Sequence, residues 1–161
     1  MYNAFIGVMC GGVIKNIKFT QASLLYSGGL VCAAGFGVVE NVCVEYQSFG
    51  CETDAEQYFG TFFGMWATEN SVVKNCIVDC RNAQVYINRN GYLLASMLNQ
   101  ASEMVGVLQD VYTLGAPLMQ KLVAKPGERE WSFGVFTGAN VADWDTNYWQ
   151  IDGENICFKD K

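Results

Sequence analysis

In the stretch GVIKNIKF, Gly12–Phe19, apolar residues alternate with lysines around a central Lys-Asn pair. Nearly the same pattern returns three times, as GVVENVCV at Gly37–Val44, SVVKNCIV at Ser71–Val78 and GVLQDVYT at Gly106–Thr113. β-branched residues that alternate over short runs favour half-buried β-strands over helices. The pattern therefore predicts short strands with a turn at the fifth position of each stretch.

A second, shorter apolar phrase precedes each stretch. It reads AFIG at Ala4–Gly7, GLVC at Gly29–Cys32, TFFG at Thr61–Gly64 and YLLA at Tyr92–Ala95, with a fifth version, FGVFTG, at Phe133–Gly138. Together the two phrases predict a single domain, 1–161, built from units of about 4–27, 28–59, 60–90 and 91–132, and a partial unit with a closing hairpin at 133–161.

The spacing of the units favours one architecture. The fifth position of the longer phrase recurs after 25, 34 and 35 residues. Such a period is typical of repeat folds, but the phrases lack the i, i+3, i+4 stripe of helical repeats, and propeller blades need longer units. We therefore expect an all-β fold, a single right-handed parallel β-helix of about five irregular coils with a C-terminal hairpin, because parallel crossovers are nearly always right-handed.

The fifth position of the longer phrase is always Asn or Asp. Its occupants are Asn16, Asn41, Asn75 and Asp110. These residue types tolerate the left-handed backbone conformation that a sharp turn requires. We expect a structural turn ladder in which stacked asparagines bond amide to amide and Asp110 ends the series.

The residues around this turn should form vertical rows. Those expected to point inward are Ile14, Val39, Val73 and Leu108, and Ile17, Val42, Cys76 and Val111. Those expected to face solvent are Lys15, Glu40, Lys74 and Gln109. Near the C-terminus, Asp152-Gly153 lies between alternating apolar residues and predicts a tight hairpin.

The composition of the chain argues against several kinds of catalytic site, metal site and partner. The chain has 161 residues, 51% of them hydrophobic, with a net charge of -6 and no histidine. Ten scattered basic residues argue against a nucleic-acid partner, and the missing histidine excludes Ser-His and Cys-His nucleophiles and His-containing metal sites. There is no run of about 18 apolar residues, so no membrane insertion is expected.

Seven cysteines without a CxxC pair predict neither a disulfide framework nor a zinc knuckle. We expect most of them to be free thiols in the core, with one or two disulfides or a reactive thiol as the alternatives.

Two groups of carboxylates are candidates for chemistry. Glu45 and Asp79 follow the same phrase in neighbouring units, so they are expected to align one coil apart, where they could share a proton, bind Ca²⁺ or act as acid and base. The alternative is two solvated residues at strand ends. Glu52, Asp54 and Glu56 have the alternate spacing of some calcium loops but lack the glycine and distal glutamate of an EF-hand, and the alternative is a plain surface loop. No other cofactor is expected.

Aromatic residues are the candidates for ligand binding. Trp144, between Asp143 and Asp145, is expected to be the better exposed candidate and could stack on a sugar or anchor a protein, as could Trp66. The alternative is that Trp144 simply packs against the rest of the chain. Trp149 lies in the alternating C-terminal segment and is expected in the core.

The segments GGLVCAAGFGVVENVCV, Gly28–Val44, and GTFFGMWATENSVVKNCIV, Gly60–Val78, resemble bacterial GLUG-type repeats, and NYWQIDGENICFK resembles the tail that often follows them. The resemblance implies a β-helical module of a large surface or secreted protein, often from gut bacteria, with an adhesive or structural role. It thus implies an extracellular or cell-surface location, although the chain shows no signal peptide, and a virus particle is the alternative.

The leading hypothesis is therefore a non-catalytic structural or adhesive module, part of a larger bacterial surface or phage assembly. Its partner would be a protein or a glycan at a surface, and end-to-end stacking or a homo-oligomer would protect the first coil. The alternative is a carbohydrate-binding or polysaccharide-degrading β-helix that uses one face.

Overall fold

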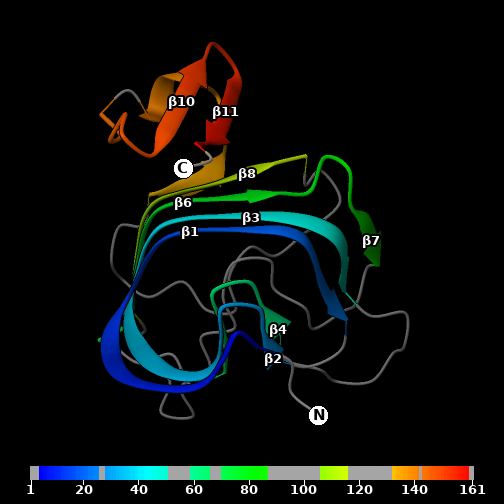
Figure 1. Ribbon diagram of the computed structural model, residues 1–161, viewed down its shortest axis with the longest axis vertical. Coiled ribbons are helices and arrows are strands. Elements are labelled where there is room, and N and C mark those ends of the chain that lie inside the picture. The colour runs from blue at the N-terminus through cyan, green and yellow to red at the C-terminus, as the bar shows by residue number, and fades with distance from the viewer. Residues whose placement is uncertain are drawn as a thin grey trace.

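The computed structural model describes residues 4–25, 28–50, 59–65, 70–86, 106–115, 132–141 and 143–159. These residues form an all-β structure, and among them only Ala139–Val141 is helical, as one turn of 3₁₀ helix (Figure 1). The strands are β1 Ile6–Leu25, β2 Gly28–Gly29, β3 Cys32–Gly50, β4 Phe59–Gly60, β5 Phe63–Met65, β6 Val72–Asp79, β7 Gln84–Tyr86, β8 Val107–Leu114, β9 Phe133–Val135, β10 Trp149–Asp152 and β11 Asn155–Phe158.

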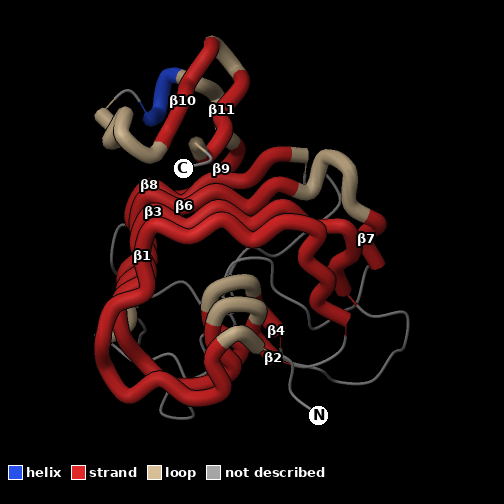
Figure 2. Tube along the Cα trace, viewed as in Figure 1, coloured by secondary structure: helices blue, strands red, loops and turns tan. Residues whose placement is uncertain are grey.

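One parallel sheet dominates the fold. Its strands follow the order β1-β3-β6-β8-β9, and β5 and β7 also pair with β3. The long strands β1 and β3 run around the same bend, and β2 and β4 form a separate short parallel pair on the concave side (Figure 2). The all-β class and the parallel pairing are confirmed. The described strands leave the sheet open, so they do not by themselves make a solenoid.

The four recurring stretches lie side by side in the expected register. Lys15 pairs with Glu40, Glu40 with Lys74, and Lys74 with Gln109. The row before it, Ile14, Val39, Val73 and Leu108, is buried throughout. Lys15 and Gln109 are exposed, and Glu40 and Lys74 are half-buried and joined by an ion pair of 3.2 Å. The alternation of the sequence thus assigns inward and outward positions correctly here.

The shorter phrase aligns differently from the prediction. Ile6 pairs with Cys32, and Cys32 with Phe63. This register sets Leu30–Ala33, rather than Gly29–Cys32, beside Ala4–Gly7, so the predicted alignment of the second copy is wrong by one residue. The cause is a run of small and apolar residues from Gly28 to Gly37, in which no polar residue fixes the phase of the alternation.

The left-handed turn is confirmed at all four predicted positions. The φ angles are 60° at Asn16, 51° at Asn41, 52° at Asn75 and 53° at Asp110. Gln21 has the same conformation, with φ 52°, beside a register shift between Phe19 and Ala22 that the sequence pattern did not predict.

The amide ladder has one hydrogen-bonded step among the described residues. Nδ2 of Asn41 donates to Oδ1 of Asn16 at 3.2 Å, whereas Oδ1 of Asn41 is buried without a hydrogen-bond partner. The Oδ1 atom of Asp110 accepts bonds from the hydroxyls of Ser132, at 2.9 Å, and Tyr112, at 3.3 Å, so its side chain is used outside the amide ladder.

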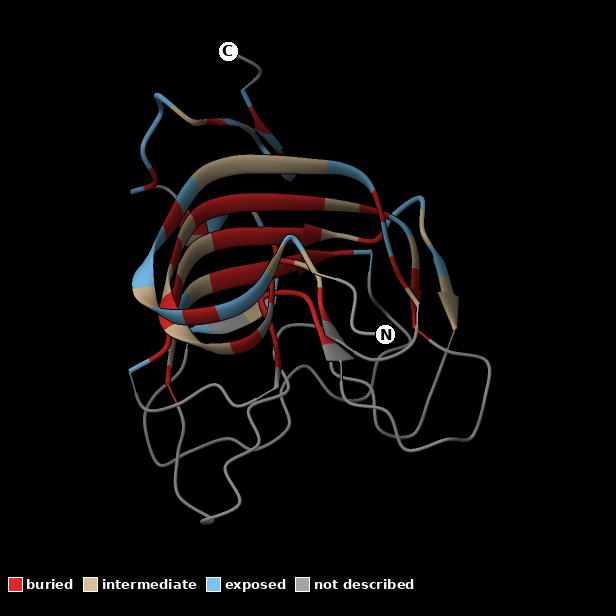
Figure 3. Cartoon of the chain, turned by 60° about the horizontal axis from the view of Figure 1, so that its bottom comes forward, coloured by how far each residue is buried: buried red, intermediate tan, exposed pale blue. Residues whose placement is uncertain are grey.

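The sheet has an apolar core on each face. The inner core holds the buried rows of β3, β6 and β8, where buried residues gather (Figure 3). The outer core lies between the sheet and the C-terminal unit, which we define as residues 136–158. Three of its sheet residues, Cys43, Ile77 and Tyr112, form one cross-strand row, and Leu114 at the end of β8 is the fourth. Because strand side chains alternate, these residues face away from Cys76 and its neighbours.

The C-terminal unit ends in the predicted hairpin. β10 pairs with β11 in antiparallel register, Asp152 opposite Asn155, so the two-residue loop is Gly153-Glu154. Gly153 has φ 58°, as the first loop residue of such a hairpin often requires. The hairpin is confirmed, and its loop lies one residue later than Asp152-Gly153. Trp149 is 1% exposed, so its place in the core is also confirmed.

The six described cysteines are free. Cys32, Cys43, Cys76 and Cys80 are buried, as expected, but Cys10 and Cys157 are exposed, and Cys51 lies outside the described residues. Cys157 is exposed because it alternates with Ile156 and Phe158, which take the buried positions of β11.

Candidate functional site

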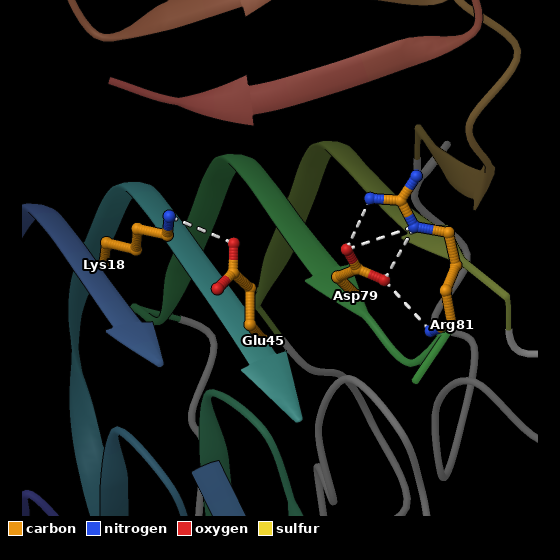
Figure 4. A network of polar contacts seen from close by, with 4 residues as sticks. All are labelled: Lys18, Glu45, Asp79 and Arg81. Atoms are coloured by element: carbon orange, nitrogen blue, oxygen red, sulfur yellow. Dashed lines mark hydrogen bonds and ion pairs between the residues drawn. The ribbon is translucent and has the colours of Figure 1, made fainter. Parts of the chain in front are cut away.

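The predicted alignment of Glu45 and Asp79 is confirmed. Glu45 is near the end of β3 and Asp79 ends β6, and the two residues pair directly across the strands. Leu114 continues the row on β8. Glu45 alternates with the outward-facing Cys43, so both carboxylates lie on the outer face, on the side of the C-terminal unit (Figure 4).

Each of these carboxylates has its own cation. Oε1 of Glu45 is 3.1 Å from Nζ of Lys18 on β1. Arg81, just beyond β6, holds Asp79 with two side-chain nitrogens, Nη2 to Oδ2 at 2.7 Å and Nε to Oδ1 at 3.0 Å, and its backbone N–H donates to Oδ1 at 2.9 Å. Figure 4 shows the two pairs side by side, with each dashed contact running from a carboxylate to its own cation.

This arrangement is unfavourable for a carboxylate acid-base pair. Such a pair works because one group keeps a proton, which requires burial or an unscreened neighbouring charge. Here each carboxylate has a cation beside it, and Arg81 contacts Asp79 through two charge-assisted hydrogen bonds. The hydrogen bond to Asp79 in turn raises the pKa of Arg81, so the ion pair is mutually reinforcing. The pairing fits two charged strand ends on a surface, with a modest contribution to stability for the half-exposed Lys18–Glu45 pair.

Sequence reasoning identified the two carboxylates and missed their partners. Lys18 comes from a different strand, and its closeness to Glu45 follows from the register of β1 on β3. Arg81 is two residues from Asp79, and a turn that brings i and i+2 together is the local signal that could have found it.

The exposure expected of Trp144 is wrong. Its side chain is 5% exposed, with its ring centroid 4.9 Å from that of Trp149 and 6.1 Å from that of Tyr112. The flanking aspartates do reach solvent. Oδ1 of Asp145 accepts from the backbone N–H and from Nδ2 of Asn147, both at 2.8 Å, so it caps a turn, and Asp143 is exposed. A sugar would find no free indole face at this position.

Several candidates lie outside the described residues. They are Trp66 and the acidic residues Glu52, Asp54 and Glu56. Within the described part of the chain, no three or more Asp, Glu, Cys or His side chains are placed to hold a metal ion.

A surface hollow lies in the C-terminal unit, away from both ion pairs. Its lining includes Thr137, Thr146, Ile151 and Glu154. The side chains are small or exposed and the hollow is wide open, so it offers hydroxyls and one carboxylate without an enclosed apolar site.

Among the described residues, four large apolar side chains are exposed, three of them on or just before β1 and one, Val135, on β9. Phe5, Val8 and Val13 are 62%, 68% and 59% exposed. They lie on or just before β1, the outermost strand at one end of the sheet order. The sequence pattern did not single out this feature, because the residues aligned with Val13 in the neighbouring stretches, Val38, Val72 and Val107, are also valines but are half-buried.

Comparison of the chain with protein-family models, with curated proteins and with solved structures returned no match. Among the described residues, no helix has the length and apolar character needed to cross a membrane.

Proposed function

We propose that the chain is a non-catalytic structural or interaction module, built as a right-handed parallel β-solenoid and belonging to a larger bacterial surface or phage assembly. The observation that carries this proposal is the use made of the aligned carboxylates. Glu45 forms an ion pair with Lys18, and Asp79 forms one with Arg81. Both aligned carboxylates are therefore used in structural ion pairs.

The path of the first coil supports the solenoid. Ile6 and Leu25, the ends of β1, pair with Cys32 and Gly50 of β3. Only residues 26–31 join the two strands, a distance of at most about 25 Å, whereas a straight 20-residue strand would span roughly 65 Å. β1 must therefore bend until its end lies near its start, as one coil of a solenoid does.

The resemblance to GLUG-type repeats supports a role at a cell surface. The strand register sets the residues that carry this resemblance, Gly37–Val44 and Val72–Val78, beside each other. In this proposal the recurring phrases specify stacking, and the function depends on the surfaces that the stack presents to a protein or glycan.

The proposal is tested by measuring turnover of a polysaccharide panel that includes polyuronates. New reducing ends and unsaturated products are followed for the wild-type chain and for Glu45→Gln, Asp79→Asn and the matched control Glu40→Gln, which removes a carboxylate from the ion pair with Lys74. We expect no product above buffer for any variant. Turnover that is lost in Glu45→Gln or Asp79→Asn and kept in Glu40→Gln would establish an enzyme instead.

A further inference from the structure

Strand β1 presents an open edge. Among the described strands it pairs only with β3, so one side of its backbone has no strand partner there. Phe5, Val8 and Val13 are exposed beside this edge. A long edge with apolar side chains is a template for strand addition, and soluble proteins usually protect such edges.

The charge of β1 is opposite to that of the chain. Ile6–Leu25 contains Lys15 and Lys18 and no acidic residue, whereas the whole chain carries a net charge of -6. Lys18 is paired with Glu45. Lys15 makes no ion pair within the described residues, because Glu40, its neighbour across the strands, is bound to Lys74.

Two cross-strand rows that end on β1, those of Lys15 and Asn16, each lack a partner beyond β1 within the described strands. From β6 to β1 the outward row reads Lys74, Glu40 and Lys15, so its charges alternate. A carboxylate on a further strand, placed beside Lys15, would continue this alternation. In the adjacent row, Oδ1 of Asn16 accepts from Asn41, while the amide nitrogen of Asn16 has no acceptor among the residues that the structure describes. An Asn or Asp oxygen on the next strand would accept that hydrogen bond.

A second copy of the chain fits this edge poorly. Two β1 edges related by a two-fold axis would bring four lysines together and no carboxylate. A head-to-tail copy would bring β9, the other end of the strand order, to this edge, and Phe133–Val135 offers no carboxylate for Lys15.

We propose that the β1 edge binds an extended acidic segment of a partner protein as a further parallel strand, with a carboxylate beside Lys15 and an Asn or Asp beside Asn16. This inference rests on the proposed interaction role and names the docking surface and the chemistry of its partner. The partner sequence that the edge selects resembles that of β3 itself, which makes the same pairings on the other side of β1.

The test uses a labelled synthetic peptide with the sequence of Gly37–Tyr46, carrying Cys43→Ser to remove its thiol. Its binding to the full chain is measured by fluorescence anisotropy. The matched control peptide carries Glu40→Lys in addition. Opposite charges across strands are favourable and like charges unfavourable by similar amounts, so we expect the control peptide to bind about 5-fold more weakly. We expect the order to reverse with the Lys15→Glu chain.

Three results would overturn the inference. They are no binding of either peptide at millimolar concentration, equal binding of both peptides to wild type and Lys15→Glu, or a dimer by light scattering that Val13→Asp dissociates, which would make a second copy the occupant. None of them affects the turnover assay, so the proposed non-catalytic role would stand or fall separately.

Discussion

Asn16, Asn41 and Asn75 share a backbone conformation that most side chains resist, with φ between 51° and 60°. Asn is the residue with a side chain that enters this region most readily, and here its amide also bonds along the stack. Asn thus adopts the backbone conformation that the turn within one strand requires, and its side chain can also hydrogen-bond to the neighbouring strand. Both roles are seen together at Asn16 and Asn41, whereas Asp110 keeps the left-handed turn and accepts hydroxyl hydrogen bonds instead.

We expect Asn41→Ala to lower the free energy of unfolding by about 1 to 2 kcal/mol, because it forces a Cβ-bearing residue without a compensating side chain into the left-handed region and removes the bond to Asn16. Asn41→Gly should be about 1 kcal/mol less damaging, since glycine has no penalty at positive φ. Urea unfolding of the three proteins measures both differences. An alanine variant as stable as the glycine variant would show that the backbone conformation costs nothing here.

The buried thiols predict a pH dependence. Burial raises the pKa of Cys43 and of Cys80 from 9.0 to about 12. The unfolded chain therefore releases these protons near pH 9 while the folded chain keeps them, so the stabilisation is complete below pH 9 and declines as the pH rises toward 12. The expected loss is about 1.4 kcal/mol per pH unit for each thiol.

Urea unfolding at pH 10 and pH 11 checks this dependence. Cys43→Ala should lose stability less steeply than the wild type by the amount of one thiol. The matched control is Cys157→Ala, which removes an exposed thiol from the outer side of β11. The same slope in Cys43→Ala and wild type would contradict the assignment of the dependence to the buried thiol.

At the scale of elements, aromatic residues pack the C-terminal unit against the sheet, and two glycines within the unit differ in their surroundings. Gly138 has φ 78°, and a Cβ there would collide with the carbonyl oxygen of Gly153. Gly153 has φ 58°, and a Cβ there would meet no atom within 4 Å. Substitution at Gly153 therefore introduces backbone strain alone, whereas substitution at Gly138 introduces strain and a steric collision within the same C-terminal unit.

We expect Gly153→Ala to cost about 1 to 2 kcal/mol, which is the left-handed penalty alone. Gly138→Ala should cost clearly more, because it adds the collision to the same penalty. The near-ultraviolet circular dichroism of Trp144 and Trp149, followed through urea unfolding, reports on this unit. Equal costs for the two substitutions would mean that Gly138 and Gly153 do not approach each other as described.

Much of the element scale was predictable because the alternation around each Asn is strict. The register of Gly12–Phe19 on its neighbours, the buried and exposed rows and the hairpin follow from it. The register of Leu30–Ala33 could not be predicted, because a uniformly apolar run does not show which residues point inward and which point outward. The burial of Trp144 could not be predicted either, since the local Asp-Trp-Asp sequence indicates exposure, and the ring is covered by the nearby Trp149 and by Tyr112 from β8.

The candidate site shows the same division. The alignment of Glu45 and Asp79 could be predicted from the spacing of the phrases. Their chemical state could not, because it depends on Lys18 and Arg81, whose positions are fixed by the pairing of β1 with β3 and by the turn after β6. A carboxylate pair in a sequence therefore becomes informative about catalysis only when its counter-charges are located.

At the scale of the whole molecule, the outer face of the sheet is covered by the C-terminal unit, while its first strand, β1, has an edge without a described strand partner. The C-terminal unit covers Cys43, Ile77 and Tyr112 on the outer face, whereas β1 leaves an apolar and basic edge at one end of the strand order. The two ends of the strand order therefore differ in chemistry, with Lys15, Val8 and Val13 exposed on β1 and Val135 exposed on β9. The proposed interaction role and the proposed acidic partner segment both follow from this asymmetry.

The central claim is that the recurring phrases are coils of one right-handed solenoid, and a crystal structure of the whole chain tests it most directly. We predict that the chain leaving each of β1, β3 and β6 returns to the start of the next strand in the stack, keeping the parallel rows of Lys15, Glu40, Lys74 and Gln109. Antiparallel pairing of these strands, or connections that carry the chain away from the stack, would contradict the account.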